Sequence, residues 1–182
     1  MNKNDVPMHY VSTREEFRDI LKKHDRFWVS NCGCREGKDD GCKRSRKDVC
    51  LVFHGDIGSS GSGKKEATRA DVDAILKEAE EKHLVTRPFW NDDRADVDGS
   101  CFCCDDCCGY FLDPKEKCDK GAMIETTKIE DCTDCGVCVD VCYFKARTMP
   151  DGKLVVDREH CYGCGLCRDV CPTDCIELFP RP

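Results

Sequence analysis

Residues 132–142 read CTDCGVCVDVC, and residues 161–172 read CYGCGLCRDVCP. Both stretches place four cysteines at the spacing C-x2-C-x2-C-x3-C. When the two stretches are aligned on their first cysteines, Gly136 falls opposite Gly165. The C-terminal part of the chain therefore contains a short internal duplication that carries eight regularly spaced cysteines.

Thiolates at this spacing are typical ligands of [4Fe–4S] clusters, whereas zinc ribbons use separate C-x2-C pairs. A tight C-x2-C-x2-C loop wraps three corners of one cluster, and the fourth cysteine, on the following helical turn, reaches the other cluster. The spacing therefore predicts two neighbouring clusters with crossed ligand sets. The first set is Cys132, Cys135, Cys138 and Cys171, and the second is Cys161, Cys164, Cys167 and Cys142.

This part of the chain resembles the bacterial-type ferredoxins that bind two [4Fe–4S] clusters, and the resemblance covers nearly all of residues 125–182. It implies a pseudo-twofold ferredoxin-like domain. Two positions depart from that family: Tyr143 follows Cys142 where proline is common, and Cys175 stands where a small residue is usual. We expect the first departure to alter only a local turn. We interpret Cys175 as a buried free thiol or as a group that modulates a cluster potential.

Nine further cysteines lie in two distant segments of residues 1–124, and Cys118 follows them without an assigned role. Free thiols oxidise readily, so this high density of cysteines indicates a metal or redox site that also stabilises the domain. Three interpretations stay open: an additional iron–sulfur cluster, cubane or noncubane, which we favour; a structural zinc site on four of the cysteines; or a dithiol/disulfide redox site. The candidate ligands are Cys32, Cys34, Cys42, Cys50, Cys101, Cys103, Cys104, Cys107 and Cys108.

The element N-C-x-C-R at residues 31–35 and the element C-x-C-C-x2-C-C at residues 101–108 precede the duplicated unit. This layout resembles a group of proteins from anaerobes described as 4Fe–4S dicluster-domain proteins, and it implies electron transfer in anaerobic metabolism. The paired cysteines also resemble motifs of heterodisulfide-reductase-like subunits, which hold atypical clusters. Arg35 is expected to lower the pKa of a nearby thiol, to hydrogen-bond a cluster sulfur, or to form a surface ion pair. His54 is the candidate for a mixed Cys/His site.

Composition narrows the functional class. The chain has 182 residues, 19 cysteines and a formal net charge of −7. The acidic balance argues against nucleic acid and favours docking onto basic patches of redox partner proteins. The odd cysteine count and an N-terminus without an apolar leader predict a reduced, cytoplasmic protein. We expect no membrane span and no bound nucleotide, since the P-loop-like run at 58–64 is followed by Lys65 where Ser or Thr should stand.

The expected fold class is α+β: a small cysteine-rich α+β domain over residues 1–124, followed by a pseudo-twofold ferredoxin-like domain over residues 125–182. Apolar periodicity and capping residues predict two amphipathic helices. The run from 88 to 100 is polar and turn-rich, and residues 112–124 are expected to connect the domains. The predicted helices are 13–24 and 68–82, the predicted strands are 27–29, 50–53, 126–129 and 153–156, and 55–65 is predicted as a loop.

These features favour a protein that relays low-potential electrons and has no catalytic residues of its own. The first alternative is a redox enzyme whose N-terminal cluster or dithiol reduces a substrate, such as a disulfide, with electrons from the ferredoxin part. The second is a zinc-stabilised docking domain fused to a ferredoxin.

Overall fold

Seven strands of the N-terminal half form one sheet in the order β4-β2-β3-β6-β5-β1-β7. The computed structural model describes residues 6–58, 60–113 and 116–182. The first five residues, and parts of the predicted 55–65 loop and of the predicted 112–124 connector, therefore lie outside the described residues. Neighbouring strands run antiparallel except β1 and β7, which are parallel. The strands are β1 (His9–Tyr10), β2 (Phe27–Ser30), β3 (Cys50–Val52), β4 (Lys65–Ala67), β5 (Val85–Trp90), β6 (Val97–Cys103) and β7 (Cys118–Asp119).

Two longer helices pack on this sheet, and two short ones carry cysteines at their starts. Helix α1 (Arg14–Leu21) and helix α3 (Arg69–Glu81) each begin with a threonine in a reciprocal capping box, which satisfies free backbone N–H groups of the first turn. Helix α2 (Gly33–Glu36) follows Cys32, and helix α4 (Gly109–Leu112) follows Cys108. No helix of the described residues is long and apolar enough to cross a membrane.

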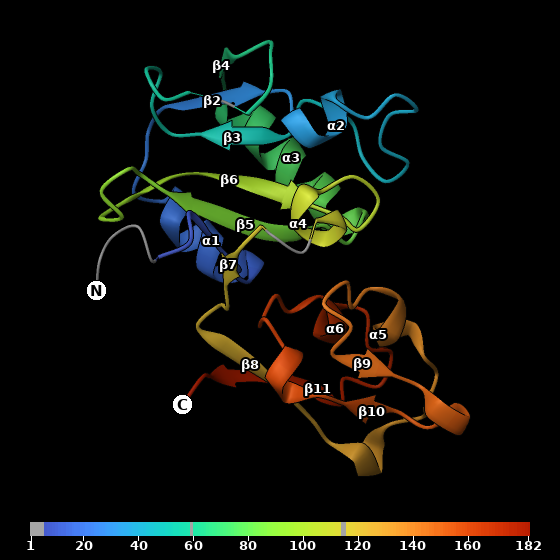
Figure 1. Cartoon of the computed structure of the whole chain (residues 1–182). Helices are drawn as coiled ribbons and strands as arrows, with labels where there is room; N and C mark the ends of the chain where they lie inside the picture. The colour runs from blue at the N-terminus through green and yellow to red at the C-terminus, as the bar shows by residue number, and fades with distance from the viewer. Residues whose placement is uncertain (1–5, 59, 114–115) are drawn as a thin grey trace.

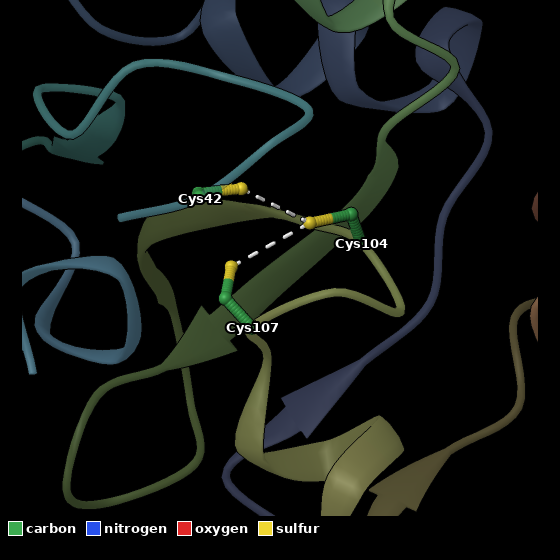
Figure 2. A group of neighbouring side chains, drawn as sticks. All are labelled: Cys42, Cys104 and Cys107. Carbon is green, nitrogen blue, oxygen red and sulfur yellow. Dashed lines mark hydrogen bonds between the residues drawn. The ribbon is translucent and has the colours of Figure 1, made fainter. Parts of the chain in front are cut away.

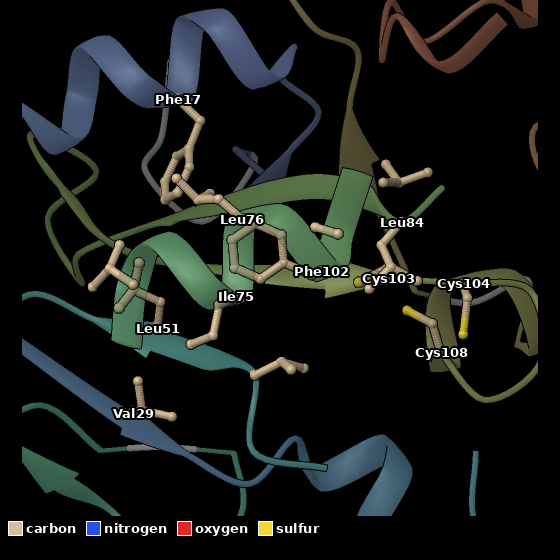
Figure 3. Close-up of a cluster of buried hydrophobic side chains, with 14 of the residues drawn as sticks. Phe17, Val29, Leu51, Ile75, Leu76, Leu84, Phe102, Cys103, Cys104 and Cys108 are labelled. Carbon is tan, nitrogen blue, oxygen red and sulfur yellow. The ribbon is translucent and has the colours of Figure 1, made fainter. Parts of the chain in front are cut away.

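The hydrophobic core lies between the helices and the sheet (Figure 3). Phe17 of α1 is fully buried and meets the edge of the Phe102 ring of β6 at 5.8 Å between centroids. Ile75 of α3 and Leu51 of β3 belong to the same cluster. Cys103, Cys104 and Cys108 lie at the end of this cluster in Figure 3, so the cysteine-rich segment is held directly by the core.

The hairpin of β5 and β6 corrects the expectation of a turn-rich stretch over residues 88–100. Pro88 and Phe89 belong to β5, which pairs with β6 from Val85↔Cys103 to Trp90↔Val97. The register of the pairing shifts between Phe89 and Trp90, next to the turn that joins the strands. The sequence does not predict this hairpin, because Asp and Gly residues break the alternation of apolar and polar residues. The two strands are stabilised by their central place in the sheet, between β3 and β1.

The C-terminal module has two separate two-stranded sheets and a repeated local arrangement. Strand β8 (Met123–Thr127) pairs antiparallel with β11 (Ile176–Pro180), and β9 (Arg147–Thr148) pairs with β10 (Val155–Val156). Each cysteine run contains a glycine in the left-handed region, Gly136 at φ 79° and Gly165 at φ 82°. Each glycine is followed by one short helix, and three 3-10 turns complete the module. The helices are α5 (Val137–Asp140) and α6 (Leu166–Asp169), and the turns are Ile129–Asp131, Pro150–Gly152 and Arg158–His160.

Helices α5 and α6 lie on the side of the C-terminal module nearer the large sheet (Figure 1). Ion pairs join α1 to α6: Arg14 contacts Asp169, and Glu15 accepts from Arg168 at 2.7 Å. The backbone N–H of Gly121 donates to the carbonyl of Tyr162 at 2.9 Å. The two halves therefore contact each other through charged and backbone groups as well as through packing.

A glycine substitution tests how closely the halves of the C-terminal module pack. Gly163 has φ 75°, and an added Cβ would lie 2.0 Å from the carbonyl oxygen of Met123. Gly136 has a similar φ of 79° with nothing within 4 Å of its Cβ position. Both alanine variants bear the left-handed strain of about 1–2 kcal/mol, but only Gly163→Ala adds the clash. We expect a clearly lower unfolding midpoint in urea, followed by circular dichroism, for Gly163→Ala than for Gly136→Ala. Equal midpoints would contradict this close packing.

Candidate metal centres

The first cysteine run and the end of the second meet around one cavity. Cys132, Cys135 and Cys138 line it from the first run, and Cys171 lines it from the second. Apolar side chains, among them Leu154 and Ile176, complete the wall. The structure thus brings together the four side chains that the spacing predicts for one cluster, in an apolar setting.

The second cavity is lined by the complementary four cysteines. Cys161, Cys164 and Cys167 come from the second run, and Cys142 comes from the end of the first. Burial raises the pKa of Cys142 above its ordinary value, and it raises the pKa of Cys167 to about 12. Thiols in such a setting stay protonated until a cation binds, because a metal favours the thiolate.

A buried ion pair lies beside these two cavities. Arg147 donates from Nη1 to the sulfur of Cys138 at 3.2 Å, and its Nη2 donates to Glu125 and Thr127. The side chains of Arg147 and Glu125 are only 1% and 2% exposed, which makes this a fully buried pair. Both residues also line the second cavity. One guanidinium therefore faces both cysteine sets.

The cysteines of the N-terminal half fall into two groups, and the sheet register explains the larger one. Leu51 of β3 pairs with Ser100 of β6, so Cys50 and Cys101 are neighbours, and the thiol of Cys101 lowers the pKa of Cys50. Cys101 and Cys103 share one face of β6 because side chains alternate along a strand. Each thiol shifts the pKa of the next in the series Cys50, Cys101, Cys103, Cys108, Cys34 and Cys32, which places these six side chains close together.

Five of these six cysteines line a cavity of about 220 Å³ together with Cys107, and three basic side chains, Arg35, Arg87 and His9, face it. Arg87 lies on β5 opposite Cys101, is 1% exposed, and donates to the sulfur of Cys108 at 3.1 Å. It also bonds Glu116 at 2.9 Å. His9 of β1 lies with its Nε2 3.8 Å from the sulfur of Cys101. The cavity is therefore lined by thiols, two buried cations and one imidazole.

Electrostatics in this cavity favour the thiolate form at Cys34 and Cys103, whereas the pKa values of Cys32, Cys101 and Cys108 are raised. Burial opposes the charged form of Arg87, but nearby Cys103, Cys118 and Cys108 outweigh it and raise its pKa. Hydrogen bonds from Cys101 and Cys108 lower the pKa of Cys103 despite its burial. Burial, followed by the charge of Arg87, lowers the pKa of His9, so its imidazole favours the neutral form that binds metals.

The smaller group consists of Cys42, Cys104 and Cys107 (Figure 2). The sulfur of Cys104 lies 3.6 Å from that of Cys42 and 3.5 Å from that of Cys107. Hydrogen bonding from Cys107, against burial, lowers the pKa of Cys104 to about 5. This trio links the loop after α2 to the turn after β6.

Several residues of the site were not found from the sequence. Arg87 and His9 lie far from any cysteine motif, and strand pairing brings them in. Arg147 and Glu125 flank the first cysteine run, but no local signal shows that they form a buried pair beside it. His54, the predicted histidine partner, is exposed and meets His24 ring to ring at 6.1 Å; the histidine that lines the cavity is His9.

Arg35, Cys175 and Cys118 are buried or half-buried beside the cysteine groups. The guanidinium of Arg35 is buried and donates to the carbonyls of Arg46 and Phe102, so the expectation of a surface ion pair is wrong. Cys175 is buried, with its sulfur 3.5 Å from that of Cys171. Cys118 is half-buried on β7 beside Arg87.

Five rings fill the junction between the N-terminal cavity and the second C-terminal cavity, and we call them the interface aromatic cluster. The guanidinium of Arg87 lies 4.6 Å from the centre of the Tyr110 ring, which meets Tyr162 at 6.1 Å. Tyr162 stacks on Phe144 at 4.3 Å, and both line the second cavity. The cluster comprises Tyr110, Phe111, Tyr143, Phe144 and Tyr162.

The 4Fe–4S dicluster domain family matches residues 131–175 of the chain. No curated protein matches the chain. The matched range contains both cysteine runs, so the family supports a ferredoxin-type module with [4Fe–4S] clusters in this part of the molecule. Together with the cysteine-lined cavities, it identifies iron–sulfur electron transfer as the class of function.

Proposed function

We propose that this protein relays low-potential electrons through two [4Fe–4S] clusters on the crossed ligand sets and through a third iron–sulfur centre in the N-terminal cavity. The observation that carries the proposal is the grouping of thiols: the predicted four around each C-terminal cavity, joined by Cys175 at the first, and six around the N-terminal one. Thiolates are the usual ligands of such clusters.

The residues present fit these groups. Bound clusters supply one-electron chemistry, and the chain tunes it through hydrogen bonds to sulfur, burial and nearby charge. Arg147 holds a donor on Cys138, and Arg87 holds one on Cys108. Each guanidinium also offsets part of the negative charge that thiolate ligands bring into a buried site. Both arginines therefore make reduction of the nearby centre easier.

The interface aromatic cluster supports a relay rather than independent centres. It extends from Arg87, at the N-terminal cavity, to Tyr162 and Phe144, at the second C-terminal cavity. The rings contact one another in sequence between the two sites, along one wall of an open cavity of about 590 Å³. Electrons that enter at one end of the protein can then leave at the other.

Exposure of one thiol favours a second candidate, a reductase of a small disulfide. Cys34 is exposed, while Cys103 and Cys108 in the same thiol chain are buried. An exposed ligand position is where a substrate could meet a centre that receives electrons one at a time. Rapid alkylation of Cys34 by iodoacetamide in the metal-loaded protein would favour this candidate, and protection would favour the closed relay.

Metal analysis of anaerobically purified protein tests the relay. We expect about twelve or more irons and a similar amount of acid-labile sulfide per chain, because three clusters exceed the eight irons of a diferredoxin. Reductive titration followed by electron paramagnetic resonance should show a third electron-accepting centre.

A double variant locates that centre. Cys103→Ser/Cys108→Ser should lose the third centre and keep about eight irons, whereas Cys118→Ser should keep all of them. Wild-type protein with eight irons and two accepting centres would refute the N-terminal cluster.

A further inference from the structure

The trio Cys42, Cys104 and Cys107 differs in spacing from every other cysteine group of the described residues. Their ligand atoms all lie within 4.8 Å of one another, and no other three His, Cys, Asp or Glu ligand atoms of the described chain do so. Figure 2 shows the three sulfurs turned toward one another from two chain segments. The C-terminal cysteines surround their cavities at wider spacing.

This spacing matches a single ion. A tetrahedral zinc ion with Zn–S bonds near 2.3 Å holds its thiolate sulfurs about 3.8 Å apart. The sulfur distances of 3.6 and 3.5 Å in the trio are close to that value. In a cubane, by contrast, each cysteine binds a different iron at a different corner, so its ligand sulfurs must stand further apart.

Burial and charge also suit a cation with three thiolates. Cys104 and Cys107 are 0% and 6% exposed. A divalent ion with three thiolates has a net charge of −1. Arg35 is fully buried, its Nε has no hydrogen-bond partner, and the nearby thiols include Cys42, Cys104 and Cys107. Its guanidinium would balance the charge of the site.

The trio joins two segments that other contacts also hold together. Lys38 pairs with Asp106 at 2.7 Å, and Arg44 pairs with Asp105 at 2.6 Å. Arg44 in turn lies 5.0 Å from the ring centre of Tyr143 in the C-terminal module. An ion bound by the trio would therefore hold in place the loop after α2, which contacts the C-terminal module through Arg44.

We propose that Cys42, Cys104 and Cys107 bind one zinc-type divalent ion as a mononuclear, redox-inactive centre, distinct from an iron–sulfur cluster of the N-terminal cavity, whose wall Cys107 also lines. Water or a small ligand takes the fourth position, because no fourth His, Cys, Asp or Glu ligand atom joins the trio among the described residues. The proposed ion is different from the proposed third cluster, so a test of one proposal does not decide the other.

Zinc and iron analysis of full-length protein, purified anaerobically from zinc-supplemented medium, tests the assignment. We expect about one zinc per chain. Cys42→Ser and Cys104→Ser should each lose most of that zinc with the iron content unchanged, because neither side chain lines the N-terminal cavity, and Cys118→Ser should retain both metals. Loss of iron from Cys42→Ser, or retention of its zinc, would overturn the assignment.

X-ray absorption at the zinc edge of the wild-type protein keeps the test independent of whether the variants fold. Three sulfur scatterers at about 2.3 Å are expected, with one lighter scatterer. Absence of zinc, or a site with four sulfurs, would overturn the three-thiolate centre. Either result leaves the third iron–sulfur cluster to be judged by its own iron count and electron paramagnetic resonance signal.

Discussion

Replacing Cys132 and Cys171 together by serine is expected to remove no more iron than replacing either one alone. The two residues belong to different cysteine runs, yet both line the first C-terminal cavity. If they bind the same cluster, each single variant and the double variant should each lose about four irons per chain. Iron and sulfide analysis of anaerobically purified protein measures this directly.

The matched comparison combines Cys132 with a cysteine of the other cavity. Cys132→Ser/Cys161→Ser should lose about eight irons, because the two side chains line different cavities. Cys175→Ser is the control, since the sulfur of Cys175 lies only 3.5 Å from that of Cys171 without belonging to a predicted ligand set. A loss of eight irons from Cys132→Ser/Cys171→Ser would show that each run binds its own cluster and would refute the crossing.

Replacing Arg147 by methionine should destabilise the protein by about 3–5 kcal/mol, because it leaves a buried carboxylate without its main partner. Glu125 is 2% exposed, and its remaining ion pair, with Arg158 at 3.1 Å, comes from a half-exposed side chain. The expected result is a large fall in the urea midpoint, followed by loss of cluster absorbance under anaerobic conditions. The double variant Arg147→Met/Glu125→Gln should recover most of that loss, since it removes both charges.

Redox measurement separates the electrostatic role of Arg147 from its structural one. The guanidinium donates to the sulfur of Cys138 at 3.2 Å, so its loss should shift the potential of the nearby cluster to more negative values. Glu125→Gln restores stability but not this donor, so the potential of the double variant should stay shifted. A double variant with the wild-type potential would show that Arg147 acts only as a structural partner of Glu125.

Much of the fold was predictable where the signal is local. The two long helices follow from apolar periodicity and from threonine caps that the structure contains as capping boxes. The strands at Phe27 and Cys50 follow from short apolar runs. The β5–β6 hairpin was not predictable in this way, because central strands with Pro88 and Gly99 depend on their neighbours for stability. For the same reason, no local signal placed Arg87 or His9 beside the thiols.

The sequence by itself determined that three ligands of each C-terminal set lie together, because they belong to one tight loop whose shape depends on nearby residues. It also supplied the nine N-terminal thiols, but without their grouping. Only the tertiary structure decided that grouping, because pairing of β3 with β6 brings Cys50 beside Cys101, and the loop after α2 brings Cys42 to Cys104. Contacts between residues so far apart depend on strand register and core packing, which no short stretch of sequence encodes.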